Sequence, residues 1–186
     1  MYTPPIVDGL RPHAIVSPVD RSLFSWPAFL DARGLTQGNS QAWPSAQKPV
    51  AVPFYLWQPE TIYQLGWLNG SGTMTDNVDV GVYDSSWNRK ISTGSTARAG
   101  ASSLQFVDVA DTPLAAPAKY FLVMSDDGTT AGQQNAWFLT SQIVQLADCW
   151  DSSTNAFPLP DPLTNMVLAA TFVIVPVMFM AFRSVV

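Results

Sequence analysis

The chain has 186 residues and a formal net charge of −5, and its 9 Lys and Arg residues are scattered along the sequence. Because phosphate binding needs clustered basic side chains, nucleic acid is not an expected partner. Charged residues make up 12% and hydrophobic residues 47%, which leaves an isolated monomer little charge for solubility and indicates surfaces that partners cover.

The length suits one domain with a full core and an extension. Cys149 is the single cysteine, which excludes an intramolecular disulfide and a cysteine-based zinc site. The first residues lack the basic start and apolar stretch of a secretory signal, so we expect synthesis in the cytoplasm.

Residues 1–50 are predicted to form an extended arm, because prolines recur through them and block helices and sheet interiors. The arm also carries large apolar side chains that are costly to leave in water. We expect it to lie over its own domain or over a neighbouring subunit, and segment 22–33 is compatible with one short helix. The predicted assembly residues of the arm are Phe24, Trp26, Phe29 and Trp43.

Residues 51–148 are predicted to form the core, a jelly-roll-like antiparallel β-sandwich. Short runs of β-forming residues recur there at regular spacing between turn signals, which is typical of an all-β sandwich or barrel. Within 120–125, residues 120–124 are apolar at successive positions, which indicates a central strand covered on both faces. Prolines predict a loop at 111–118. The predicted strands are 52–57, 62–68, 77–83, 89–93, 104–109, 120–124 and 136–145.

Four stretches of this core carry a resemblance: 66–70 (GWLNG), 77–84 (NVDVGVYD), 92–96 (STGST) and 104–109 (LQFVDV). Over residues 50–144 the chain resembles a family of small phage virion structural proteins with a carbohydrate-binding-module-like jelly roll. The resemblance implies a structural protein of a phage particle, located in the virion, and carries over no catalytic residues. Together with the low charge and the apolar segments at both ends, it leads us to expect a non-enzymatic protein on the particle surface, of the capsid decoration, cement or head-fibre type. We expect a homo-oligomer, with a trimer favoured, that contacts major capsid or tail proteins.

No sequence motif for catalysis is present. The chain lacks a Gly-x-Ser-x-Gly elbow, a His-Glu-x-x-His motif and a phosphate loop, and it has one histidine, His13, so we expect no enzymatic activity. A glycoside hydrolase remains the weakest alternative, because its paired carboxylates are close in space rather than in sequence. The carboxylates available to it in the core are Asp79, Asp84, Asp108 and Asp126.

Trp87 and Trp150 are the candidate ligand-binding aromatics, with Asn88 as a hydrogen-bonding neighbour. A tryptophan at a turn can stack on a sugar ring, although structural packing explains such a residue equally simply. Trp67 and Trp137 lie within strand patterns and are expected in the core. The alternative function is therefore a glycan-binding adhesin, located on a tail or fibre, that attaches the particle to host surface sugars.

Asp126 and Asp127 are the candidate metal ligands, because aspartates in a sandwich loop can bind calcium. The same Asp-Asp-Gly sequence is also ordinary turn chemistry. No other cofactor is expected.

Residues 149–186 are predicted to form a linker followed by an apolar tail. Residues 166–182 contain no charge, which raises the possibility of a membrane helix. The run is at the short limit for a span, Pro176 interrupts it, and it is rich in β-branched residues, so we favour one or two buried strands and no membrane. The predicted assembly residues of the tail are Phe172, Ile174, Met178 and Phe182.

Overall fold

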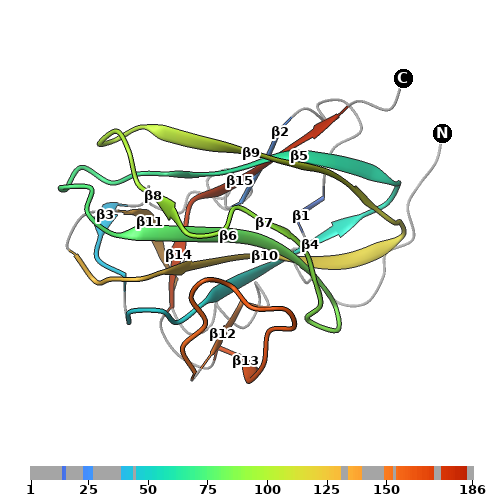
Figure 1. Cartoon of the computed structure of the whole chain (residues 1–186). Coiled ribbons are helices and arrows are strands. Elements are labelled where there is room, and N and C mark those ends of the chain that lie inside the picture. The colour runs from blue at the N-terminus through green and yellow to red at the C-terminus, as the bar shows by residue number, and fades with distance from the viewer. Residues whose placement is uncertain are drawn as a thin grey trace.

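The protein is an all-β antiparallel β-sandwich, as the sequence predicted (Figure 1). The computed structural model describes residues 14–15, 23–26, 39–43, 45–130, 134–139, 149–152, 154–169 and 173–183, and all regular structure within these ranges is β. Every described strand pair is antiparallel except that between β1 and β4.

The largest sheet, called sheet A here, has eight strands, and its main path runs β13-β12-β4-β10-β6-β7. Strand β1 pairs with β4, and β8 pairs with β6. β10 lies between β4 and β6, which confirms its prediction as a central strand. The strands are β1 (Ala14–Ile15), β4 (Val50–Leu56), β6 (Asn77–Asp84), β7 (Arg89–Ser92), β8 (Thr96–Ala97), β10 (Ala118–Asp126), β12 (Trp150–Ser152) and β13 (Met166–Leu168).

The facing sheet, called sheet B, has four strands in the order β2-β15-β5-β9. A third sheet of three strands has the order β14-β11-β3. The strands of sheet B are β2 (Leu23–Trp26), β5 (Glu60–Leu68), β9 (Leu104–Leu114) and β15 (Met178–Arg183), and those of the third sheet are β3 (Asn39–Gln41), β11 (Gln134–Leu139) and β14 (Val173–Pro176).

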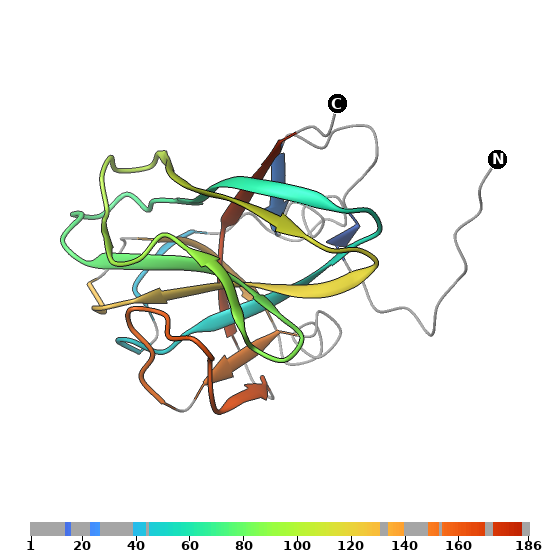
Figure 2. The same cartoon turned by 45° about the vertical axis from the view of Figure 1, so that its right-hand side comes forward.

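The main core lies between sheets A and B, which face each other in Figure 2. Strand alternation places Val78, Val80 and Val82 of β6 in this core, each fully buried. Trp67 of β5 is also fully buried, as predicted, whereas the side chain of Trp137 lies outside the described residues. Phe121 and Val123 of β10 belong to a second, smaller apolar cluster, because successive strand residues point to opposite faces.

Two local predictions are wrong in part. β9 continues to Leu114 through part of the loop predicted at 111–118, and it accommodates Pro113 because an edge strand does not need every ladder donor. Strand β2 occupies part of the segment for which a helix was considered. Its pairing with β15 satisfies the backbone groups of residues 23–26 that face this neighbour. Local propensity cannot predict such a pairing between distant segments.

The arm and the tail both join the chain's own sheets. β1 lies parallel to β4, and β2 pairs with β15. The described part of the apolar tail forms β13, β14 and β15, which confirms strands for these residues. There are three strands where one or two were predicted, and Val167 and Leu168 of β13 are exposed rather than buried. No helix among the described residues is long and apolar enough to cross a membrane.

Three predicted assembly residues are inside the chain's own core. Trp43, Met178 and Phe182 are 2%, 0% and 3% exposed, so in this structure the three side chains pack within the chain's own core, which for Trp43 is one of the two positions expected for the arm. The cause is that β15 completes sheet B between β2 and β5 and turns its apolar side chains inward. The backbones of Phe24, Trp26 and Ile174 lie in strands, but their side chains, and all of Phe29 and Phe172, are outside the described residues.

Replacing Met178 by Ala should therefore destabilise the folded chain itself. We expect a loss of about 2–5 kcal/mol in the free energy of unfolding, from lost burial and the cavity left behind. Urea denaturation measures it, and Thr73→Ala, at an exposed position, should change it by less than about 0.5 kcal/mol. Unchanged unfolding combined with dissociation of an oligomer would restore an assembly role for this residue.

Candidate functional site

The two tryptophans singled out as ligand contacts lie side by side on sheet A. Trp87, in the turn after β6, stacks on Phe121 with ring centroids 4.2 Å apart. The ring of Trp150, in β12, packs edge-on against the rings of Trp87 and Phe121, with centroid distances of 5.4 Å and 6.1 Å. We call these three rings the aromatic cluster. The fold thus joins residues from three separate parts of the sequence at one place.

The aromatic cluster is part packing and part surface. Phe121 is 3% exposed, whereas Trp87 and Trp150 are half-buried. The ammonium group of Lys119 lies 4.9 Å from the centre of the Phe121 ring. Asn88 is exposed beside Trp87, and its backbone N–H donates to Asp84 Oδ1 at 3.0 Å, which fixes the turn. The rings support one another and leave part of both indoles open to solvent.

A loop of residues 154–165, called the strap here, connects β12 to β13 and packs against β6 and β7. Its Leu159 N–H donates to Asp79 Oδ2 at 2.9 Å, and the Tyr83 hydroxyl donates to Pro160 O. Arg89 donates from Nη1 to Leu159 O and from its backbone N–H to Asp161 Oδ1. Ala156, Leu159 and Leu163 of the strap share the smaller apolar cluster with Phe121 and Tyr83. The strap thus fixes the surroundings of the aromatic cluster.

Asp79 is a fully buried carboxylate beneath the strap. Burial raises the pKa of this carboxyl above its ordinary value, although the Leu159 N–H, the Thr93 hydroxyl and the Arg89 charge act in the opposite direction. Burial likewise raises the pKa of the neighbouring Tyr83 phenol. The strap therefore rests on groups whose ionisation the surroundings disfavour.

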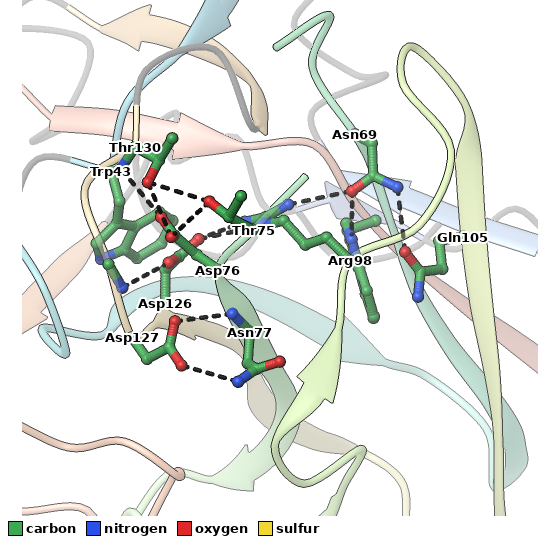
Figure 3. Close-up of polar contacts among 12 residues, drawn as sticks. Trp43, Asn69, Thr75, Asp76, Asn77, Arg98, Gln105, Asp126, Asp127 and Thr130 are labelled. Atoms are coloured by element: carbon green, nitrogen blue, oxygen red, sulfur yellow. Dashed lines mark hydrogen bonds and ion pairs between the residues drawn. The ribbon is translucent and has the colours of Figure 1, made fainter. Parts of the chain in front are cut away.

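A second polar network holds one end of the sandwich together (Figure 3). Arg98 Nη2 lies 2.6 Å from Asp126 Oδ2, and the two side chains are 0% and 2% exposed. Arg98 also donates to Asn69 Oδ1, which accepts a second hydrogen bond from Trp67 Nε1. The Asn69 amide donates to Ala99 O at 2.7 Å. The network links β5, β10 and the segment that follows β8.

The two predicted calcium ligands face different protein groups in this network. Asp126 binds Arg98, whereas Asp127 accepts hydrogen bonds from the backbone and side chain of Asn77. The neighbouring Asp76 accepts two hydrogen bonds from Thr130. Within the ranges that the structure describes, no group of three or more His, Cys, Asp or Glu side chains could hold a metal ion. The geometry gives each of these carboxylates a protein partner.

The four carboxylates considered for glycoside hydrolysis do not form a common site. Asp79 lies under the strap, and Asp84 pairs with Lys90 at 2.7 Å. Asp108 lies on the other sheet and accepts from Gln64 Nε2 at 2.7 Å. Asp126 belongs to the buried ion pair at the end of the sandwich. Their partners are those of structural side chains.

Sequence reasoning missed the strap contacts and the Arg98 network. The alternation of Asp79 with valines in β6 offered one signal, since a charged residue in an apolar strand needs a partner when it is buried. Arg98 offered no such signal, because its partner is distant in sequence.

The chain matches no protein-family model, and no curated protein or solved structure was found to match it.

Arg98→Met should cost about 3–5 kcal/mol of unfolding free energy at pH 7, because it leaves the Asp126 carboxylate buried without its cation. Burial already raises the pKa of Asp126, with Arg98 opposing that shift. Without Arg98 the Asp126 carboxylate is protonated more easily. The loss of unfolding free energy relative to the wild type should therefore shrink as the pH falls toward 4. Denaturation of Arg98→Met/Asp126→Asn is the control, and it should recover part of the loss. A deficit independent of pH and unaffected by the second substitution would contradict the assignment.

The unfolding free energy of the Asp79→Asn variant, relative to that of the wild type, should increase as the pH rises. The folded-state pKa of Asp79 is raised, so between the unfolded value of 3.8 and the folded value the native state binds more protons than the unfolded state. The wild type therefore loses stability across that window with increasing pH, and the variant does not. The measurement is the difference in unfolding free energy between the two proteins from pH 4 to 7. Asp108→Asn, at an exposed aspartate, controls for the loss of one charge; equal slopes for both variants would refute the role of burial.

Proposed function

We propose that the protein is a non-enzymatic structural protein of a phage particle, located on the particle surface. The observation that carries the proposal is the set of exposed apolar side chains at sheet edges. Leu104 and Phe106 of edge strand β9 are 51% and 37% exposed, and Val167 and Leu168 of edge strand β13 are 52% and 43% exposed. Apolar side chains at exposed edges are typical of surfaces that neighbours cover.

Low charge supports the same proposal. Only 12% of the residues are charged, and a freely diffusing protein normally relies on more surface charge than this for solubility. The resemblance described for residues 50–144 supplies the kind of assembly. We therefore propose contacts with copies of the chain and with other virion proteins such as the major capsid or tail proteins, made through sheet edges.

An antibody raised against the purified chain should label intact phage particles when it is applied to a gradient-purified lysate and viewed by electron microscopy. We expect labelling because a surface component remains accessible after assembly. Preimmune serum is the control. Antigen found only in the particle-free fractions would contradict the virion role.

A glycan-binding adhesin on a tail or fibre is the second candidate, and the proximity of Trp87 and Trp150 favours it. Two half-buried indoles 5.4 Å apart, with the exposed Asn88 amide beside them, provide stacking surface and a hydrogen-bonding group for a sugar ring. The packing of Trp87 on Phe121 explains the same residues as structural. The two interpretations differ in whether the solvent-facing part of the rings binds a ligand.

Trp87→Ala and Trp150→Ala should each weaken binding to host surface glycans by about 1 kcal/mol or more if the cluster is a sugar platform. A glycan array measures this, and thermal unfolding verifies that each variant is folded. Trp57→Ala removes an indole that is 47% exposed in the β4–β5 turn and serves as the control. Equal array signals for wild type and both cluster variants would leave the rings with a packing role alone.

A further inference from the structure

The edge strands differ in how they are protected against pairing with another chain. β9 carries Asp108, Asp111 and Pro113, and it has a register shift opposite β5. β7 carries Arg89 and Lys90 among its four residues. Charges, prolines and bulges at an edge are the usual means by which proteins prevent edge-to-edge pairing. These two edges are therefore poor places for a strand to be added.

β13 has none of these protections. Its three residues are Met166, Val167 and Leu168, and it ends sheet A with β12 as its partner among the described strands. Val167 and Leu168 are exposed. Among the strands that the structure describes, β13 thus combines an unpaired outer edge with an apolar surface, the combination that favours the addition of a strand.

The hydrogen bonds of β13 to β12 define which of its backbone groups face outward. Ala169 N–H donates to Cys149 O at 2.9 Å, next to the Trp150↔Leu168 pair. Because hydrogen-bonded and non-hydrogen-bonded pairs alternate along an antiparallel ladder, Val167 directs its N–H and C=O toward β12. Met166 and Leu168 direct theirs away from the sheet. The outer edge therefore offers two residues with correctly spaced donors and acceptors.

We propose that β13 pairs with β13 of a second copy of this chain, antiparallel and around a two-fold axis at Val167. In this register Met166 of one copy and Leu168 of the other exchange backbone hydrogen bonds, and the two Val167 residues form the close, non-hydrogen-bonded pair. The result is one continuous sheet across two protomers. This inference rests on the proposed role in an assembly and names the partner at one edge.

Charge explains why the partner at this edge is a second copy. A two-fold contact brings the same surface of each copy together. Pairing through β9 would therefore bring Asp108 and Asp111 of one copy close to the same two aspartates of the other, and pairing through β7 would bring Arg89 and Lys90 close to theirs. β13 and its neighbours Asn165 and Ala169 carry no charge, so this edge meets its copy without repulsion. A two-fold joins copies in pairs, which differs from the trimer expected from the sequence.

Charge exchange at Val167 tests the proposal with the full-length chain. Val167→Lys alone and Val167→Glu alone should each weaken self-association by up to about fivefold, because like charges directly opposite on paired strands repel. An equimolar mixture of the two variants should restore association, since the introduced ammonium group then faces the introduced carboxylate only if the two-fold lies at this residue. Light scattering after size-exclusion chromatography, at about 50 μM so that micromolar contacts are populated, gives the masses.

Ser85→Lys and Ser85→Glu, at an exposed turn position, are the matched controls and should leave the mass unchanged; circular dichroism verifies folding of all variants. Three outcomes would overturn the pairing. The first is a monomeric wild type, and the second is association that is unaffected in both Val167 variants. The third is a mixture of the two variants that stays dissociated, which would indicate a different partner or register. Antibody labelling of phage particles does not depend on these outcomes. Labelling without self-association would indicate a virion protein that lacks this contact, and self-association without labelling would indicate a protein that pairs with itself outside the virion.

Discussion

The fold depends on the insertion of strand β15 between β2 and β5. This strand comes from the end of the chain, β2 comes from its beginning, and β5 from its middle. The insertion places Met178, Met180 and Phe182 against the core, and it supplies hydrogen-bond partners to both neighbours at once. Contacts between such distant segments carry a large loop-closure cost, so sheet B is complete only when both ends of the chain are in place.

The chain uses its own segments to cover much of sheet A. The strap lies over Asp79 and Tyr83, and Trp87 and Trp150 pack against Phe121 of β10. Since these segments are held by hydrogen bonds to side chains as well as by apolar contact, the covered area is fixed as part of the domain. The large apolar side chains that stay exposed in the described part of the chain lie in a turn or on edge strands, among them Trp57, Leu104 and Val167.

The buried polar groups serve different purposes in the two regions that were candidate sites. Arg98 and Asp126 compensate each other's charge where three segments meet, which makes the network costly to break from one side only. Asp79 instead accepts hydrogen bonds from neutral donors and has the Arg89 charge nearby. A buried carboxylate of this kind keeps a raised pKa and holds a loop by accepting its backbone N–H.

The sequence by itself determined the strand content, because alternation such as that of Val78, Val80 and Val82 has a period of two and needs no knowledge of the partner strand. It also identified β10 as central and the uncharged tail as strand, from residue type and length. Only the tertiary structure decided that Met178 and Phe182 fill the chain's own core, that Trp87 reaches Trp150, and that Arg98 meets Asp126. Those facts depend on strand order and on pairing between distant segments, and the apolar pattern of a strand is the same whether its own sheet or a neighbour covers it.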